Sequence, residues 1–449
     1  MEKTTVIYNA HIVNEGRTFH GAVEMTGDKI ANVYEGIHPR PSFAGADMID
    51  AGGRLLLPGV IDSHVHFRDP GLTHKGSIAT ESAAAVAGGV TTFMDMPNTV
   101  PPTTTIDALE RKLQRASEAS LANYAFFFGA TNDNFNEVKK LDPSRTPGVK
   151  LFLASSTGDM QVDRNRTIER LLGESGHLIA VHAEDEALIK RNASVIKSRF
   201  KREPDASYHP MIRSEEACYV ASSRIVEMAV RMGVRLHLLH LSTAREITLL
   251  DGWKPLSEKK ITAEACVPHL WFCDLDYATR GSRIKCNPAI KATEDRSALR
   301  KAVKYGYIDT IATDHAPHLL QEKEGGCFSA ASGMPMVQHS LVAMLELVSK
   351  QVFRIEKVVE KMSHNPAELF RIDRRGYIRP GYFADLVLVT PSKYWTVSPN
   401  NVLYKCKWSP LEGCLFGHKV WKTFVNGRLA YDNGPVANPA CGKEIAFSR

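Results

Sequence analysis

The sequence predicts an α/β fold: a (β/α)8 barrel of the TIM type, with a small β-sandwich domain built from both chain ends. Three observations predict it. Two strand-rich ends flank a middle part in which apolar runs alternate with helical patterns. The apolar runs are nearly continuous, as expected of parallel strands that are covered on both faces. Several of them end in histidine or aspartate, and barrel active sites lie at the carboxyl ends of the strands.

Short strands with turns make up both ends of the chain. Near the start, TTVIYNAHIV is followed by a turn at Asn14-Glu15-Gly16, and near the end VWKTFV is followed by a turn at Asn426-Gly427. Because the two termini of a domain often lie close together, we expect these ends to pair. The predicted small domain therefore comprises residues 1–57 and 376–449, and the predicted barrel comprises residues 58–375.

Apolar runs in the middle of the chain are the predicted barrel strands. They are Val60–His66, Thr91–Met96, Tyr124–Ala130, Val149–Ala154, Leu178–Ala183, Arg235–Ser242, Ile261–His269 and Thr310–Pro317. The clearest helix is Glu215–Met232, with apolar residues at helical spacing and Ser214 as its predicted N-cap. A doubly wound open sheet would alternate in the same way. The chain has no GxGxxG-type phosphate loop, however, so the nucleotide-binding version of that fold loses support.

Composition and charge exclude several classes of function. Of the 449 residues, 43% are hydrophobic and 24% are charged, which is ordinary for a globular protein. The formal charge of +6 comes without a dense run of Lys or Arg, which argues against nucleic-acid binding. No stretch resembles a signal peptide or a membrane span, and the eight cysteines form no CxxC pair. We therefore expect a cytoplasmic protein with reduced thiols and no membrane contact.

Histidine and aspartate residues at strand ends indicate a metal site. His64 and His66 end a buried strand in PGVIDSHVH, and side chains two residues apart share one face of a strand. Both imidazoles therefore point into the barrel mouth, as suits zinc-type coordination. His182, His240 and Asp314 end three further runs. A single buried histidine is usually satisfied by a backbone carbonyl, but four histidines and one aspartate at the active face of one barrel favour a metal site.

Lys150 lies inside the apolar run GVKLFL. A buried lysine tends to lose its charge. A neutral amine can react with carbon dioxide to form a carbamate, an anionic oxygen ligand that can bridge two cations. The alternative is a lysine at the edge of the strand whose ammonium group reaches water.

Five segments resemble, in type and order, the motifs of the binuclear amidohydrolase superfamily, and within it those of the dihydroorotase family. They are PGVIDSHVHFRDPG, GVKLFL, AVHAE, LLHLST and ATDHAPH. The resemblance covers nearly the whole chain, including RRGYIRPGYFADLVLV near its end. It implies the barrel-plus-sandwich fold and two zinc ions per subunit. The implied ligands of the first ion are His64, His66, carboxylated Lys150 and Asp314. The implied ligands of the second ion are Lys150, His182 and His240.

Substrate choice depends on four further residues. Arg68 follows the histidine pair, and the HxHxR arrangement of dihydroorotases implies that it grips a substrate carboxylate in a bidentate manner. A surface arginine is the alternative. The resemblance also implies that Asn98 and His318 bind the carboxylate and that Asn287 contacts the ring amide. Asn98 and Asn287 are each next to a proline, so a plain turn role is the alternative for both.

The implied reaction is the reversible, zinc-dependent hydrolysis of the cyclic amide of dihydroorotate to N-carbamoyl-aspartate, a step of de novo pyrimidine biosynthesis. Asp314 would take a proton from the attacking water and pass it to the leaving nitrogen. The chain departs from the family at Lys75-Gly76, where many dihydroorotases carry Lys-Glu. Two alternatives stay open. One is an allantoinase- or hydantoinase-type cyclic amidohydrolase, against which Arg68 argues. The other is a non-catalytic, dihydropyrimidinase-like scaffold protein. The expected partner is a small-molecule substrate, and a homodimer is one alternative for the assembly.

Overall fold

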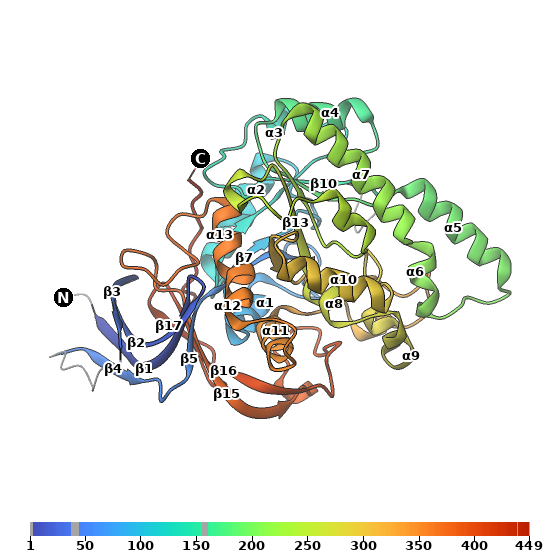
Figure 1. The fold of residues 1–449 in the computed structure, drawn as a ribbon. Coiled ribbons are helices and arrows are strands. Elements are labelled where there is room, and N and C mark those ends of the chain that lie inside the picture. The colour runs from blue at the N-terminus through green and yellow to red at the C-terminus, as the bar shows by residue number, and fades with distance from the viewer. Residues whose placement is uncertain (1–2, 37–44, 155–159, 438, 449) are drawn as a thin grey trace.

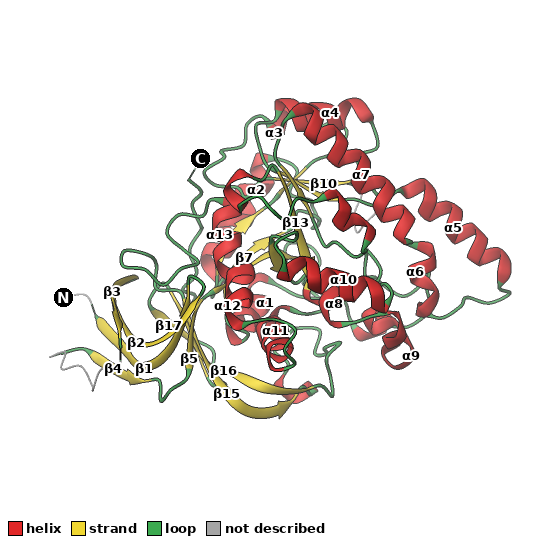
Figure 2. Cartoon of the chain, viewed as in Figure 1, coloured by secondary structure: helices red, strands yellow, loops and turns green. Residues whose placement is uncertain are grey.

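The computed structural model describes residues 3–36, 45–154, 160–437 and 439–448. Figure 1 shows a barrel surrounded by helices, with a sheet-rich lobe beside it in which blue N-terminal strands and red C-terminal strands come together. In Figure 2 the helices form an outer layer around the central strands. The predicted fold class, a TIM-type barrel with a small β-sandwich, is confirmed.

The barrel has eight parallel strand positions, one of which is divided in two. The strands are β6 (Val60–Val65), β7 (Val90–Asp95), β8 (Asn123–Phe126), β9 (Phe128–Gly129), β10 (Val149–Phe152), β11 (Ile179–His182), β12 (Leu236–Leu238), β13 (Ile261–Cys266) and β14 (Thr310–Ala312). Strands β6 to β8 pair in sequence, and so do β9 to β14. The two sheets meet where His66 N donates to His315 O over 2.7 Å and where Phe127 N donates to Asp95 O over 3.0 Å.

Helices follow most of the barrel strands and cover them. They are α1 (Ile78–Ala87), α2 (Ile106–Ala119), α3 (Phe135–Val138), α4 (Asn165–Glu174), α5 (Glu186–Arg199), α6 (His209–Ile212), α7 (Glu215–Met232), α8 (Val267–Trp271), α9 (Tyr277–Arg280), α10 (Thr293–Lys304), α11 (Ser340–Ser349), α12 (Ile355–Val359) and α13 (Asn365–Phe370). Helix α7 has its predicted bounds. Ser214 accepts a hydrogen bond from Ala217 N, and Gly233 ends the helix in the left-handed conformation, with φ of 67°.

The small lobe is an eight-stranded sheet that both ends of the chain share. Its strands are β1 (Thr4–Asn14), β2 (Arg17–Thr26), β3 (Lys29–Glu35), β4 (Asp47–Asp50), β5 (Leu55–Pro58), β15 (Leu386–Thr396), β16 (Leu415–Val425) and β17 (Arg428–Asp432). Strand β5 pairs with β1 on one side and with β15 on the other. The ends of the chain therefore pair, as predicted, while the division into residues 1–57 with 376–449 and residues 58–375 stays a proposal.

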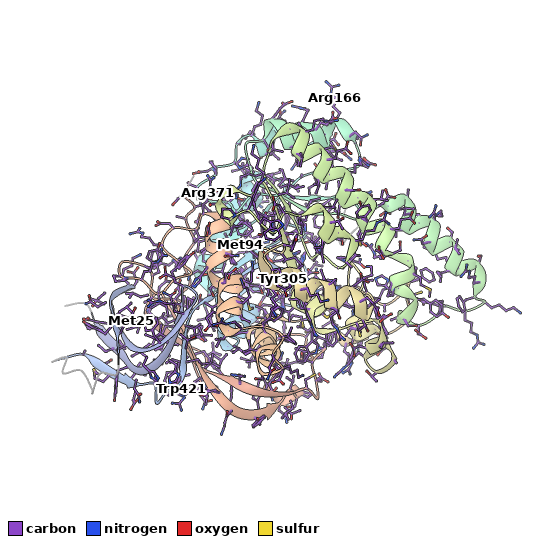
Figure 3. The ribbon with its side chains drawn as sticks, in the orientation of Figure 1. Met25, Met94, Arg166, Tyr305, Arg371 and Trp421 are labelled. Carbon is purple, nitrogen blue, oxygen red and sulfur yellow. The ribbon has the colours of Figure 1, made fainter. Side chains whose placement is uncertain are left out.

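Each lobe has an apolar cluster of its own, and a larger cluster continues across both lobes. Met25 packs with Leu386 and other residues of the small sheet, whereas Met94 packs with Ile61 and Phe370 in the barrel. Figure 3 shows the two methionines in these different parts of the molecule. Within the described ranges, no helix combines the length and apolarity needed to span a membrane. All eight cysteines are free thiols, in agreement with the sequence.

Three predicted strands end three to five residues before their apolar runs do. Strand β13 ends at Cys266, and α8 begins at Val267. The reason is Pro268, which cannot donate to a strand ladder and whose fixed φ suits the first turn of a helix. The runs of β12 and β14 end early because the backbone then turns left-handed, with φ of 38° at His240 and 50° at Asp314.

Candidate active site

One cavity at the carboxyl ends of the barrel strands contains every residue that the sequence predicts for the site. Its volume is about 400 Å³. The predicted residues that line it are His64, His66, Arg68, Asn98, Lys150, His182, His240, Asn287, Asp314 and His318. They come from β6, β10, β11 and the loops that follow the strands, so the barrel topology alone brings them together.

His64, His66 and Asp314 form a compact group of ligand atoms. Asp314 Oδ1 lies 3.1 Å from His66 Nε2 and 3.4 Å from His64 Nε2. One nitrogen of each ring and one carboxylate oxygen all lie within 4.8 Å of one another. Burial opposes the charged carboxylate, but His64 and His66 hold the pKa of Asp314 well below its usual range. An ionised carboxylate beside two imidazoles is a donor set that a divalent transition metal prefers.

The remaining predicted histidines continue this group across the barrel. The ring centroids of His64 and His240 are 5.2 Å apart, and those of His240 and His182 are 4.7 Å apart. His182 Nδ1 lies 2.9 Å from His240 Nε2. Burial, followed by the neighbouring His182, lowers the pKa of His240 well below its usual value. The lowered pKa favours the neutral form of His240, which is the form in which a histidine binds a metal.

Lys150 is fully buried, and among the described residues its Nζ has no hydrogen-bond partner. Burial lowers its pKa to about 8, although the Asp314 carboxylate acts in the opposite direction. An orphaned, partly neutral amine at the centre of a polar cavity is unfavourable by itself. Conversion to a carbamate that binds cations would remove this penalty. The burial of Lys150 therefore fits a carbamate better than a lysine whose ammonium group reaches water.

Two side chains contact the Nδ1 atoms of His64 and His66. The Glu264 carboxylate contacts Nδ1 of His64, and Asn98 Oδ1 lies 2.7 Å from Nδ1 of His66. Because these oxygens accept, both Nδ1 atoms carry the proton and both Nε2 lone pairs face Asp314. Such partners fix the tautomer and orientation of metal-binding histidines. Glu264 was not predicted from the sequence. Like Lys150, however, it is a charged residue inside an apolar run, ITAEAC.

Arg68 is buried at the cavity wall, with 2% of its surface exposed. Its Nε donates to Pro317 O over 3.1 Å, and its Nη2 lies 3.1 Å from His318 Nε2. Burial lowers the pKa of Arg68 to about 10, so the guanidinium stays charged at neutral pH. The described residues include no carboxylate that forms a salt bridge with it. This guanidinium, which lies beside His318, is therefore available to an anion in the cavity.

Asn287 is held from outside the cavity. Its Oδ1 lies 2.9 Å from His209 Nε2, which is also 3.0 Å from Cys286 O. Further lining residues that the sequence analysis did not single out are Phe152, Arg213, Lys285, Ala316, Phe328, Ser329, Ala330, Ala331, Ser332 and Gly333. Most of these offer small side chains or backbone, which carry no pattern that a sequence could reveal. Arg213 forms an ion pair with Glu184, which follows His182 by two residues and contacts its ring.

Backbone strain is concentrated at the site. Arg68, His240 and Asp314 all have left-handed φ values, of 67°, 38° and 50°. A non-glycine residue in this region costs about 1–3 kcal/mol where its neighbours enforce it. The fold thus holds three of the ten predicted residues in unfavourable conformations, as is common where side chains are aimed at a ligand.

Known proteins resemble the chain over both lobes. The model of the amidohydrolase family matches residues 55–430. A dihydroorotase of Halobacterium salinarum is 35% identical over 385 residues, which are 85% of this chain and 87% of that protein. An allantoinase of Bacillus velezensis is 29% identical over 440 residues, 97% of this chain and 95% of that one. Among solved structures, the L-hydantoinase (dihydropyrimidinase) of Arthrobacter aurescens has a TM-score of 0.92 at 26% identity and covers 99% of this chain and 100% of its own.

Proposed function

The chain belongs to the amidohydrolase family and is a cyclic amidohydrolase, and on this basis we propose that it is a dihydroorotase. The proposed reaction is the reversible hydrolysis of dihydroorotate to N-carbamoyl-aspartate, in pyrimidine biosynthesis. The observation that carries the proposal is the buried, charged guanidinium of Arg68 in the wall of the cavity. A buried cation without a carboxylate partner is unfavourable unless a ligand brings the anion. Dihydroorotate has a carboxylate on its ring, whereas the rings of hydantoin and dihydrouracil have none.

We assign two zinc ions to the cavity. His64, His66, Lys150 and Asp314 would hold the first, and Lys150, His182 and His240 would hold the second, with Lys150 as the carbamate. The clustered ligand atoms and the orphaned Lys150 amine support this assignment. When bound, the ions supply Lewis acidity that makes water a nucleophile at neutral pH.

Asp314 is the proposed proton carrier. Its low pKa keeps it ionised, and it lies at the centre of the ligand group, beside both His64 and His66. From there its carboxylate can accept a proton from the attacking water as the water oxygen bonds to the amide carbonyl carbon. It then returns that proton to the ring nitrogen as the carbon–nitrogen bond breaks. No net proton is lost within the site in this cycle.

Four polar residues orient the ring. Arg68 and His318 face the substrate carboxylate. Asn98 is the third proposed partner of this carboxylate, since its amide oxygen contacts His66 and its amide nitrogen can donate. Asn287 is placed for the ring amide. Fixing one carboxylate and one amide of the ring defines which carbonyl faces the attacking water.

An allantoinase- or hydantoinase-type activity is the second candidate. The allantoinase of Bacillus velezensis aligns with almost the whole chain, and the hydantoinase of Arthrobacter aurescens shares its fold closely. A non-catalytic scaffold has less support, because each predicted type of metal ligand is present and faces the cavity. The charge of Arg68 separates the two enzymatic candidates.

The test is the ratio of kcat/KM for dihydroorotate and dihydrouracil, in the wild type and in Arg68→Met. We expect the wild type to prefer dihydroorotate. Removing one partner of a buried ion pair is worth about 3–5 kcal/mol, so Arg68→Met should lower dihydroorotate turnover roughly a hundredfold to several thousandfold. Metal content should not change, and turnover of dihydrouracil should be equal or higher.

Two outcomes of this experiment would reject the proposal. One is a wild-type enzyme that prefers the neutral ring. The other is an Arg68→Met variant that slows both substrates equally. In either case a hydantoinase-type enzyme takes the place of a dihydroorotase.

A further inference from the structure

The loop that begins at Arg68 and ends at Lys75 contacts both ring nitrogens of His318. Lys75 Nζ lies 3.2 Å from His318 Nδ1, and Arg68 Nη2 lies 3.1 Å from His318 Nε2. The loop closes on itself, since Leu72 N donates to Arg68 O and Lys75 N donates to Leu72 O. Two cationic side chains of one loop therefore contact the two ring nitrogens of one imidazole. Trp408 Nε1 holds the main chain of the same residue by donating to His318 O over 2.8 Å.

The chemistry of these partners determines where His318 carries its proton. Neither an ammonium nor a guanidinium group can accept, so the single lone pair of neutral His318 can face Lys75 at Nδ1 or Arg68 at Nε2, but not both. The carbonyl oxygen of Ser332 beside Nε2 can only accept, which favours the proton on Nε2 and the lone pair on Nδ1, facing Lys75. The Nε2–H then donates to Ser332 O, which lies 3.1 Å away. A carboxylate oxygen of Glu322 also lies near Nδ1, but at 3.5 Å it is farther than Lys75. His318 is therefore neutral and presents a donor, not an acceptor, toward Arg68.

This proton arrangement matters for Arg68. With Nε2 protonated, His318 gives the Nη2 edge of the guanidinium no acceptor. Arg68 satisfies its Nε at Pro317 O, and the Nη edge is left for an anion in the cavity. In the opposite tautomer, Nε2 would accept from Arg68 and compete with that anion.

We propose that Lys75 is a positioning residue for the carboxylate subsite: it holds His318 as the Nε2–H tautomer and so keeps Arg68 and His318 available together as donors to the substrate carboxylate. The inference rests on the proposed function, because it assumes a carboxylate-bearing ring. Lys75 acts through His318, since it is 9% exposed and is not among the residues that line the cavity. Glu322 Oε1 lies 2.6 Å from Lys75 Nζ and holds the ammonium in place.

The experiment measures kcat and KM separately for dihydroorotate and dihydrouracil in Lys75→Met, Lys75→Gln and Lys75→Arg. A charge-assisted hydrogen bond corresponds to roughly a tenfold to hundredfold change. We expect Lys75→Met to raise KM for dihydroorotate by that factor, with kcat changed less than about twofold and dihydrouracil kinetics unchanged. Lys75→Gln keeps a donor without the charge and should raise KM less. Lys75→Arg should restore most of the affinity.

The matched control is Lys301→Met, on the exposed side of α10, which should leave all constants unchanged. Metal content and the melting temperature of each variant report whether the site and the fold are intact. A structural role alone would lower kcat for both rings, and that result would overturn the inference while the proposed function stands. So would an unchanged KM in Lys75→Met. A wild type without dihydroorotate turnover would overturn the proposed function and this inference together.

Discussion

The side-chain oxygen of Asn98 lies 2.7 Å from Nδ1 of His66. The contact joins a predicted substrate residue to a predicted metal ligand. The amide oxygen fixes the proton on Nδ1 and leaves the Nε2 lone pair for a cation. Asn98 thus links the proposed metal site to the proposed substrate subsite.

Asn98→Ala tests this connection. Loss of a hydrogen-bond partner of a metal-binding histidine commonly lowers metal affinity by about 10–100-fold, and we expect a loss of this size. The measurement is zinc retention during titration with a chelator. The exposed Asn136→Ala on α3 is the control and should retain zinc like the wild type. Zinc retention by Asn98→Ala equal to that of the control would show that Asn98 does not support the metal site.

Lys150→Ala should remove metal and activity together. The small side chain cannot form a carbamate, so both proposed ions lose a shared ligand. Short carboxylic acids added to the variant should restore part of the metal content and of the turnover, because a free carboxylate can occupy the vacated space. Exposed Lys139→Ala is the control and should show neither effect. Full metal content in Lys150→Ala would contradict the bridging role.

Asp314→Asn should keep the fold and much of the metal but lose the proton carrier. The expected loss of kcat is on the order of a thousandfold or more, corresponding to several kcal/mol of transition-state stabilisation. Metal analysis of the same sample separates this loss from loss of the ions. Near-normal turnover in Asp314→Asn would remove Asp314 from the proposed mechanism.

Ser214→Ala should destabilise the protein without changing catalysis. Ser214 caps α7 by accepting a hydrogen bond from Ala217 N, and such caps contribute about 1 kcal/mol. The melting temperature should therefore fall, while kcat/KM stays the same. Ser223→Ala, at a half-buried position within α7, removes a hydroxyl that only donates to the Val220 carbonyl of the same helix, and it should not lower the melting temperature. Equal melting temperatures for the two variants would argue against the cap.

Residue patterns in the sequence were sufficient to predict the barrel, because its strands are continuous apolar runs and its ligands are chemically distinctive. His64 and His66 were recognisable by their spacing, and Lys150 by its position in an apolar strand. The pattern around Lys75 shows only a departure from the family, because the proposed role of Lys75 depends on a loop that returns it to His318. The left-handed backbone at His240 could not be predicted, since hydrophobic periodicity carries no information about φ.

The pairing of β5 with β15 has a consequence for the order of folding. These strands are separated in the sequence by the whole barrel. During synthesis from the N-terminus, β5 presents an unpaired edge until residues 386–396 have emerged. Contacts between such distant segments form late, and open strand edges invite association with other chains. We therefore expect the nascent chain to depend on chaperones more than its finished, closed sheet would suggest.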